Sequence, residues 1–230
     1  MKVVMFDLYD TILKDLSFDF DKGLEYLYDL IFHEYCTKDE LLAYANSLIP
    51  MFHNRIKTYE ELSFIGKELP LLLDKFNVIS NISLDELDYQ FMLQTQKVTL
   101  LDEVKDYLVY LGKNNIKMYI LSNTIFSTKS TKRLLEDFNI LQHFNNVYCS
   151  SDYGYRKPSI KFYEYGINHI LEDNPSCNRK DIVYIGNDYN TDVKGGLNAG
   201  LNVIWYNVNN NDNIEQLPIR NIQAFYELMN

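Results

Sequence analysis

After residue 97 the chain of 230 residues alternates short apolar runs with helical stretches. Four apolar runs have the length and composition of buried strands, at 117–121, 146–149, 182–185 and 202–206. Helical patterns lie between them, near 102–111, 128–138, 160–171 and 192–199. Strands that alternate with helices in this way predict a parallel sheet covered by helices on both faces. The sequence therefore predicts an α/β fold with a Rossmann-like parallel sheet core.

The segment from about residue 18 to residue 96 has a different pattern. Its apolar residues recur at intervals of three and four, as in Leu24, Leu27 and Ile31, and four such stripes predict four amphipathic helices. A further short strand at 2–6 precedes this segment and belongs with the later sheet. We therefore predict one α/β domain formed by 1–14 and 98–230, with 15–97 inserted as a helical domain.

Composition narrows the class of function. The formal net charge is −10, which argues against a nucleic-acid partner because a basic patch would be expected. Three cysteines without metal-like spacing argue against a disulfide framework. No window approaches the roughly 20 apolar residues of a membrane span. We expect a cytoplasmic protein without membrane contact, a monomer or a homodimer, whose partner is a small molecule.

Polar side chains follow four of the predicted strands or the loops behind them. In open α/β sheets ligands bind at the carboxyl ends of the strands, so these side chains should meet there. Crowded carboxylates repel each other unless a cation joins them, and hard oxygen ligands suit Mg²⁺. The residues at these positions are Asp7, Tyr9, Thr11, Ser122, Asn123, Lys157, Asn187, Asp188 and Asp192.

Four segments in this order resemble the motifs of the haloacid dehalogenase (HAD) superfamily. They read FDLYDT, LSNT, YRKPSIKFY and IGNDYNTDVKGGLNAG. The resemblance covers essentially the whole chain, and it implies the HAD fold with the helical insertion as a four-helix-bundle cap. It also implies a hydrolase that acts through an aspartyl-enzyme intermediate.

The resemblance assigns roles to single residues. Asp7 is the expected nucleophile, Ser122 holds an oxygen of the substrate, and Lys157 neutralises Asp7 and the transferred group. Thr11 and Asn123 are expected to bind the substrate. We expect the neighbouring Arg156 to be a surface residue.

The expected metal ligands depart from the family pattern at the fourth motif. Family phosphatases show Gly-Asp-Ser where this chain shows Gly186-Asn187-Asp188. A Mg²⁺ ion would be held by Asp7, by the backbone carbonyl of Tyr9, and by either Asn187 or Asp188. Asp192 is expected to be a further ligand or a partner of the ligands, or to cap the helix that follows.

Tyr9 is the second departure, because family phosphatases carry an aspartate there as the general acid. Tyrosine has a reference pKa of about 10 and is a poor acid near neutral pH. Tyr9 therefore leaves three interpretations open. We favour a Mg²⁺-dependent phosphatase acting on a small phosphorylated metabolite with a good leaving group. The alternatives are a metal-independent 2-haloacid dehalogenase and a catalytically weak binding module.

The cap is expected to select the substrate. Its many aromatic residues are compatible with an apolar substrate body, although most must pack against each other. Arg55 could grip an anion, but a solvated helix face explains it better. We expect the cap to close over the core through hinges near 14–17 and 98–100.

Overall fold

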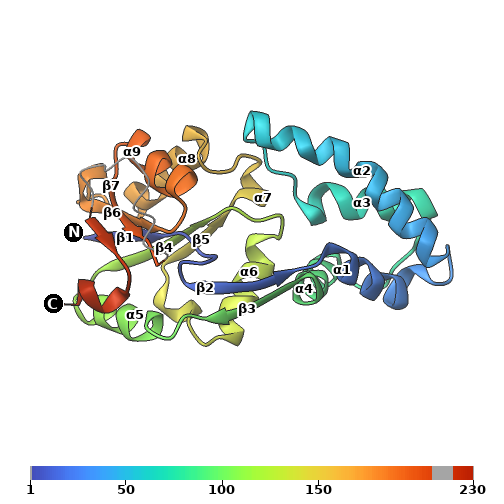
Figure 1. The fold of residues 1–230 in the computed structure, drawn as a ribbon, viewed down its shortest axis with the longest axis horizontal. Coiled ribbons are helices and arrows are strands. Elements are labelled where there is room, and N and C mark those ends of the chain that lie inside the picture. The colour runs from blue at the N-terminus through green and yellow to red at the C-terminus, as the bar shows by residue number, and fades with distance from the viewer. Residues whose placement is uncertain (1, 209–219, 230) are drawn as a thin grey trace.

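The computed structural model describes residues 2–208 and 220–229, apart from the side chains of residues 52–54 and 56. Figure 1 shows an elongated molecule with a sheet and its covering helices at one end. A group of helices forms the other end, and two long strands run between the two parts (Figure 1).

A six-stranded sheet forms the core, and each strand is parallel to its neighbours. In spatial order its strands are β5 (Asn146–Cys149), β4 (Lys117–Ser122), β1 (Val3–Phe6), β6 (Ile182–Gly186), β7 (Asn202–Tyr206) and β8 (Arg220–Ile222). The prediction of a parallel α/β sheet is confirmed, with strands at all five predicted positions. The sequence reasoning missed β8, because its three residues Arg-Asn-Ile form no apolar run.

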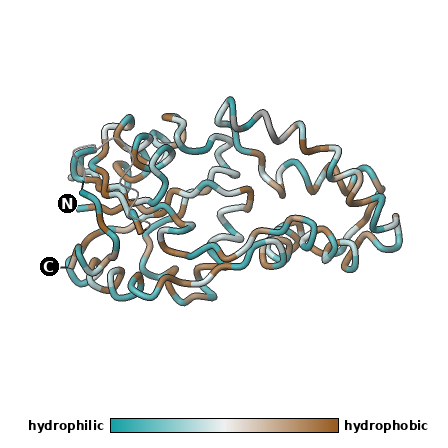
Figure 2. Tube along the Cα trace, in the orientation of Figure 1, coloured by the Kyte–Doolittle hydropathy of each residue, from teal (hydrophilic) through white to brown (hydrophobic). Residues whose placement is uncertain are grey.

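Helices cover both faces of this sheet because its central strand is apolar on both. Val4 and Phe6 of β1 belong to one buried cluster and Val3 and Met5 to another. The first cluster includes residues of α5 (Val104–Lys113) and α6 (Thr128–Asp137), and the second includes residues of α8 (Ile160–Asp173). Figure 2 shows hydrophobic stretches along the central strands and hydrophilic ones on the outer helices.

Shorter helical segments complete the core. They are η3 (Leu141–His143), α7 (Ser150–Tyr153), η4 (Arg179–Asp181), the π-helical η5 (Tyr189–Lys194), α9 (Gly195–Asn198) and η6 (Phe225–Leu228).

The cap contains the four predicted helices. They are α1 (Phe20–Leu27), α2 (Lys38–Thr58), α3 (Leu69–Phe76) and α4 (Leu84–Thr95), and two π-helical segments extend them, η1 (Tyr28–Phe32) and η2 (Phe64–Glu68). Helices α1 and α4 lie side by side, with α2 and α3 above them in Figure 1. The rings of Phe64 and Phe91 stack with centroids 3.8 Å apart, so aromatic packing joins η2 to α4.

A two-stranded antiparallel ribbon connects the cap with the core. It consists of β2 (Leu13–Phe18) and β3 (Gln96–Leu100), with a register shift between Asp15 and Ser17. The expected hinges at 14–17 and 98–100 both lie on this ribbon, and so do the expected domain boundaries. Both expectations remain predictions.

Contacts on two sides of the cap also join it to the core. The buried Asp88 of α4 accepts hydrogen bonds from the backbone N–H and hydroxyl of Ser127 and from the hydroxyl of Ser130 at the start of α6. On the other side of the cap, residues 59–61 run beside residues 154–156, the segment just before Lys157. We call this second contact the 59–61 bridge. Its hydrogen bonds run from Glu61 N to the Gly154 carbonyl (2.9 Å) and from Arg156 N to the Tyr59 carbonyl (2.8 Å).

Candidate active site

Asp7 stands at the carboxyl end of the central strand β1. The strands β4 and β6 flank β1, so the segments that follow these three strands meet at one edge of the sheet. Asp7 is only 7% exposed, and its backbone N–H donates to the Ile185 carbonyl of β6 (2.9 Å). A buried carboxylate at this position needs polar partners, because desolvation of an unpaired charge is costly.

Lys157 provides that partner. Its ammonium group lies 2.5 Å from Asp7 Oδ1, 2.7 Å from Asp192 Oδ1 and 2.7 Å from the Tyr184 hydroxyl. An ammonium has three N–H donors, and these three acceptors use all of them. The Lys157 side chain is 1% exposed, so the buried cation sits between two carboxylates.

The charges in this cluster shift each other's protonation. Burial raises the pKa of Asp7 to about 6, against the opposite pull of Lys157. Burial alone would lower the pKa of Lys157, but the carboxylates of Asp192 and Asp7 raise it above the ordinary value. Lys157 therefore stays protonated, and Asp7 is ionised near neutral pH and above.

Sequence reasoning did not find Tyr184, and it named Gly186 without its role in this cluster. Tyr184 accepts from Lys157 and donates to Asp192 Oδ1 (2.9 Å), which closes a ring of hydrogen bonds around the lysine. A Cβ on Gly186 would lie 2.5 Å from Cγ of Asp192, so the strand end must be glycine for this carboxylate to fit. In the sequence, only the position of Tyr184, two residues before Gly186, distinguishes it from other tyrosines.

Thr11 links the first motif to the fourth. Its hydroxyl lies 3.1 Å from Asp7 Oδ2 and 3.3 Å from Asn187 Oδ1. One hydroxyl proton cannot serve both oxygens at once. The Trp205 indole N–H donates to the Asn187 carbonyl (2.9 Å) and holds the backbone at this point.

Asp188 and Asp192 have different surroundings from Asn187. Asp188 is exposed, and its Oδ1 accepts from Asn190 N (2.9 Å) and Thr191 N (2.6 Å) as the N-cap of η5. Asp192 is 1% exposed, and both of its oxygens are occupied, since Oδ2 accepts from Asp188 N (2.9 Å). Asp188, rather than Asp192, is therefore the capping residue, and Asp192 serves the lysine.

The second motif provides one free and one occupied side chain. The Ser122 hydroxyl at the end of β4 is buried and has no hydrogen-bond partner among the described residues. The Asn123 amide donates to the Lys157 carbonyl (3.0 Å) and accepts from Lys157 N (2.7 Å). Asn123 therefore holds the lysine loop in place, and this use of its amide competes with the expected substrate contact.

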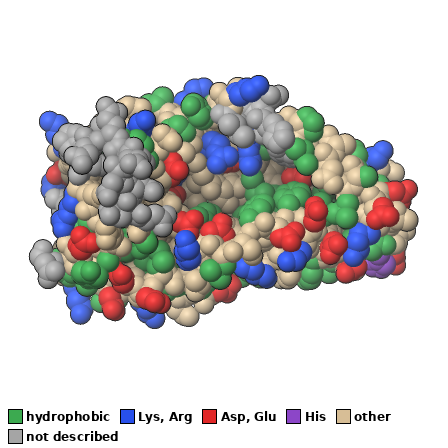
Figure 3. All heavy atoms as spheres, in the orientation of Figure 1, with side chains coloured by type: hydrophobic (Ala, Val, Ile, Leu, Met, Phe, Trp, Pro, Cys, Tyr) green, Lys and Arg blue, Asp and Glu red, His purple; other side chains and the backbone are tan. Residues whose placement is uncertain are grey.

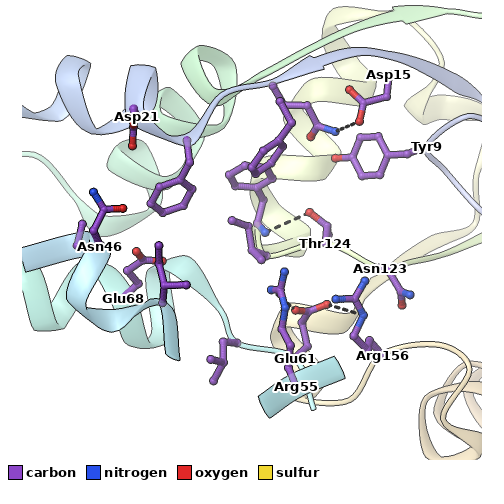
Figure 4. Close-up of a pocket in the computed structure, with 18 residues that line it drawn as sticks. Tyr9, Asp15, Asp21, Asn46, Arg55, Glu61, Glu68, Asn123, Thr124 and Arg156 are labelled. Carbon is purple, nitrogen blue, oxygen red and sulfur yellow. Dashed lines mark hydrogen bonds and ion pairs between the residues drawn. The ribbon is translucent and has the colours of Figure 1, made fainter. Parts of the chain in front are cut away.

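A pocket of about 610 Å³ opens beside these residues, between the cap and the core (Figure 4). Tyr9, Asn123 and Arg156 line it, and each is a close sequence neighbour of Asp7, Ser122 or Lys157. Figure 3 shows hydrophobic side chains on the wall of the hollow between the two ends of the molecule. The rest of the lining consists of Asp15, Phe18, Phe20, Asp21, Ala45, Asn46, Ile49, Arg55, Glu61, Leu62, Glu68, Gln96, Thr124, Ile125 and Phe126.

The Tyr9 hydroxyl points into this pocket (Figure 4). It is buried and makes no hydrogen bond within the described residues. Burial raises the pKa of Tyr9 well above its ordinary value. The phenol is therefore a weaker acid here than in water.

Arg55 and Arg156 were both expected at the protein surface, and the structure places both in the pocket wall. Arg55 lies in the pocket wall, where its guanidinium is 2.8 Å from Glu61 Oε1, so the interpretation as a solvated helix face is wrong. Arg156 also lines the pocket, 3.6 Å from Glu61 Oε2, and is not a simple surface residue. Glu61 is buried and accepts from the Ser150 hydroxyl (2.9 Å) as well. Cap and core thus share one buried carboxylate, which the local sequence could not show.

Comparison with known proteins places this fold and site in a family. Residues 18–206 match the model of the haloacid dehalogenase-like hydrolases. The chain belongs to this family and is a hydrolase. The matched segment begins after Asp7, Tyr9 and Thr11, so the first motif lies outside it.

Two curated relatives match nearly the whole chain. The HAD-hydrolase YfnB of Bacillus subtilis is 24% identical over 239 residues, covering 100% of this chain and 95% of the relative. The pyrimidine 5′-nucleotidase PynA of Streptococcus pneumoniae is 26% identical over 234 residues, covering 99% of this chain and 93% of the relative.

Solved structures share the fold. A crystal structure of YfnB bound to magnesium, titled as revealing interdomain movement, has a TM-score of 0.58 at 20% identity and covers 99% of this chain and 96% of that one. The 2-haloacid dehalogenase of Pseudomonas syringae pv. Tomato has a TM-score of 0.62 at 19% identity, with the same coverage. Similarity at this identity shows the fold alone, so the site itself must decide the reaction.

Two features are absent from the described part of the chain. None of its helices is long and apolar enough to cross a membrane. Residues 2–208 and 220–229 also contain no cluster of three or more His, Cys, Asp or Glu side chains placed to hold a metal ion.

Proposed function

We propose that this hydrolase is a phosphatase that transfers the phosphoryl group of a small phosphate ester to Asp7 and then to water. The observation that supports it best is the buried cluster of Asp7, Lys157 and Asp192. Its lysine holds one carboxylate ready beside a fixed positive charge, which suits attack on an anionic phosphoryl group.

In the first step a carboxylate oxygen of Asp7 attacks phosphorus. The new O–P bond forms as the bond from phosphorus to the ester oxygen breaks, and the leaving alcohol takes the electron pair and a proton from water. In the second step water attacks the aspartyl phosphate. The acyl phosphate is cleaved, inorganic phosphate leaves, and the Asp7 carboxylate is restored.

Lys157 and Ser122 stabilise charge during both steps. The Lys157 ammonium offsets the negative charge of Asp7 and of the phosphoryl oxygens as a point charge. The Ser122 hydroxyl has a free donor at the end of the neighbouring strand, and we assign it to a phosphoryl oxygen. Asn123 fixes the lysine loop through its two hydrogen bonds with the Lys157 backbone.

Tyr9 determines which leaving groups the enzyme can expel. A phenol with a raised pKa gives little of the 10²–10⁴-fold acceleration that a general acid typically provides. Substrates whose leaving group needs no proton, such as acyl and aryl phosphates, should therefore react fastest.

The donor set at the first and fourth motifs fits a Mg²⁺ ion. Because the Thr11 proton cannot serve both Asp7 Oδ2 and Asn187 Oδ1, one of these oxygens is left without a donor. Asp7, Asn187 and the Tyr9 carbonyl would hold the ion, which prefers such hard oxygen ligands and keeps several waters. A bound Mg²⁺ would neutralise charge on the phosphoryl group. Both oxygens of Asp192 are occupied, so Asp192 is a poor ligand, and Asp188 already uses Oδ1 as the N-cap of η5.

One observation favours a haloacid dehalogenase as the second candidate. Tyr9 stands where the general acid would be, and a halide leaves without a proton. In that reaction Asp7 would attack carbon, and no metal would be needed.

Product release decides between the candidates. We would measure phosphate release from acetyl phosphate, p-nitrophenyl phosphate and a sugar phosphate, and chloride release from 2-chloropropionate, each with and without Mg²⁺. Release of phosphate that needs Mg²⁺, is fastest for the first two esters and is lost in Asp7→Asn supports the phosphatase. Release of chloride without metal contradicts it, and a lack of any product favours a binding module.

A further inference from the structure

The charged side chains of the pocket are divided between its two sides. In Figure 4, Arg55, Glu61 and Arg156 lie together on the side of Asn123, the residue that holds the Lys157 loop. Asp21, Asn46 and Glu68 lie together on the cap side (Figure 4). Both arginines thus lie near the predicted phosphate site with Glu61 between them, whereas Asp21 and Glu68 lie away from it and Asp15 lies beside Tyr9 (Figure 4).

Glu68 is the most unusual of the acidic side chains. It is 4% exposed, lines the pocket, and makes no hydrogen bond or ion pair with any described residue. Burial raises the pKa of Glu68 to about 8, and the positive charge of Arg55 only partly opposes this. A buried carboxylate without a partner is costly, so a ligand that brings a positive charge would relieve the cost.

The ribbon side of the pocket also has more acceptors than donors. Gln96 Nε2 donates to Asp15 Oδ2, which leaves Asp15 Oδ1 and Gln96 Oε1 buried without a donor. The hydroxyl of Tyr9 is the one free donor that lines the pocket among the buried side-chain atoms without partners. Empty acceptors of this kind are satisfied by N–H groups of a ligand.

The two arginines do not reverse this balance. Both lie against Glu61, so the three side chains together carry one net positive charge. Glu68, Asp15 and Asp21 together carry up to three negative charges. Phe18, Phe20 and Phe126 complete the wall, and aromatic faces attract cations.

From this arrangement we propose that the pocket binds the organic part of a phosphate ester that carries a positively charged amino group. The phosphate lies toward Lys157 and the amino group toward Glu68, with Asp15 and Gln96 accepting further hydrogen bonds. This inference rests on the proposed phosphatase function. Esters with a second anionic group bind more weakly, because the carboxylate of Asp21 repels them and the unpaired oxygens of Asp15 and Gln96 offer them no donor.

Direct binding to Asp7→Asn tests this independently of turnover. Titration calorimetry at pH 7 would compare glucosamine 6-phosphate, glucose 6-phosphate and 6-phosphogluconate, which present a cationic, a neutral and an anionic body on a similar scaffold. We expect the amino sugar phosphate to bind at least about tenfold tighter than the neutral ester. The anionic ester should bind least. Equal dissociation constants, or tightest binding of the anionic ester, would overturn the proposal.

Substitution of Glu68 tests whether this residue causes the preference for the amino ester. In Asp7→Asn, the further change Glu68→Gln should reduce the preference for the amino ester to about threefold or less. The matched control Glu34→Gln, an exposed cap residue outside the pocket, should leave it unchanged. If Glu68→Gln keeps the full preference, the site is wrongly placed.

Proton release gives a second readout. Because Glu68 is mostly protonated at pH 7 in the empty pocket, binding of a cation should release up to one proton. The charge of Arg55 favours the ionised form of Glu68, and burial opposes it. Calorimetry in two buffers of different ionisation enthalpy measures this release, which should vanish in Glu68→Gln. No release with intact Glu68 would contradict the proposal.

Failure of the phosphatase proposal can be told apart from failure of the pocket proposal. A wild-type enzyme that releases no phosphate from p-nitrophenyl phosphate, while Asp7→Asn still prefers the amino ester, refutes the phosphatase and leaves the pocket assignment intact. Phosphate release without any preference among the three esters refutes the pocket assignment alone.

Discussion

The two sides of this active site treat buried charge in opposite ways. At the strand ends Lys157 uses all three donors on Asp7, Asp192 and Tyr184. In the pocket Asp15 Oδ1 and Gln96 Oε1 have no hydrogen-bond partner among the described residues, and the charge of Arg55 only partly offsets the burial of Glu68. The first group is complete without a substrate, and the second becomes complete only with one.

This difference assigns catalysis to the strand ends and substrate selectivity to the pocket. The complete cluster costs no rearrangement when the reaction begins, which is the condition for electrostatic catalysis. The incomplete pocket gains free energy only from a ligand with matching groups, which is the condition for selectivity. Substitutions at the strand ends should therefore affect every substrate, and substitutions in the pocket should affect some.

The largest effect is expected for Asp7→Asn. Loss of the nucleophile should lower phosphate release about 10⁴-fold or more for every ester. The control Asp10→Asn keeps the left-handed backbone of a residue with φ of 57°, which asparagine tolerates, and should stay close to wild type. Steady-state rates measure both. Equal loss in the two variants would contradict the assignment of Asp7.

Lys157→Met should remove activity and destabilise the fold. Without the ammonium, Asp7 and Asp192 face each other as buried carboxylates, and breaking such a pair typically costs about 3–5 kcal/mol of unfolding free energy. Urea unfolding at pH 7 measures this. Lys161→Met, at an exposed position, is the control, and a similar loss there would show that the cluster has no special role.

Tyr9→Asp tests the missing acid. It should raise turnover of an alkyl phosphate relative to p-nitrophenyl phosphate by about 10²-fold, since only the alkyl ester needs a proton. Tyr9→Phe should change neither ester much, because the hydroxyl has no partner among the described residues. Parallel changes in both esters would count against the leaving-group argument.

Tyr184→Phe should have a moderate effect. Loss of the hydroxyl leaves one Lys157 donor unpaired, at a cost of about 1–2 kcal/mol, and the lysine is held less firmly. We expect kcat to fall about tenfold while KM stays near its wild-type value. Tyr119→Phe removes a hydroxyl that accepts from Asn174 instead, and its kcat should not change.

The smallest effect concerns stability and Glu68. Because the folded pKa is about 8 and the reference value is 4.5, the unfolded chain loses a proton in this range that the folded chain keeps. Stability therefore falls as pH rises from 4.5 to 8. The Tm of Glu68→Gln should therefore rise relative to the Tm of wild type as the pH increases across this window. Each kcal/mol of unfolding free energy that wild type loses corresponds to a Tm difference of about 2–4 °C. The exposed-site control Glu34→Gln, measured by thermal unfolding in the same buffers, should show no such trend.

The sequence predicted the parallel sheet and the helical cap because both depend on local pattern. Short buried strands and amphipathic stripes are written in neighbouring residues, as in 202–206, which matches β7 residue for residue. The β2–β3 ribbon was not predicted, because its burial pattern is mostly exposed and gives no apolar run.

At the site, the motif residues could be placed at one sheet edge, but their partners could not. Asp192 was expected near a metal, and the structure pairs it with Lys157 because Gly186 leaves room for its carboxylate. Arg55 and Glu61 lie far from Arg156 in sequence, and only the fold shows that they share a pocket wall. Such long-range pairs have no local signal.

The 59–61 bridge has a consequence for the timing of the reaction. It hydrogen-bonds the cap to residues 154–156, and the next residue along the chain is Lys157. A cap that swings away would release this segment, while Asn123 of the core would still hold the backbone of Lys157. The lysine loop would then have one support in place of two, so substrate entry and full immobilisation of the catalytic lysine would be linked to the same contact.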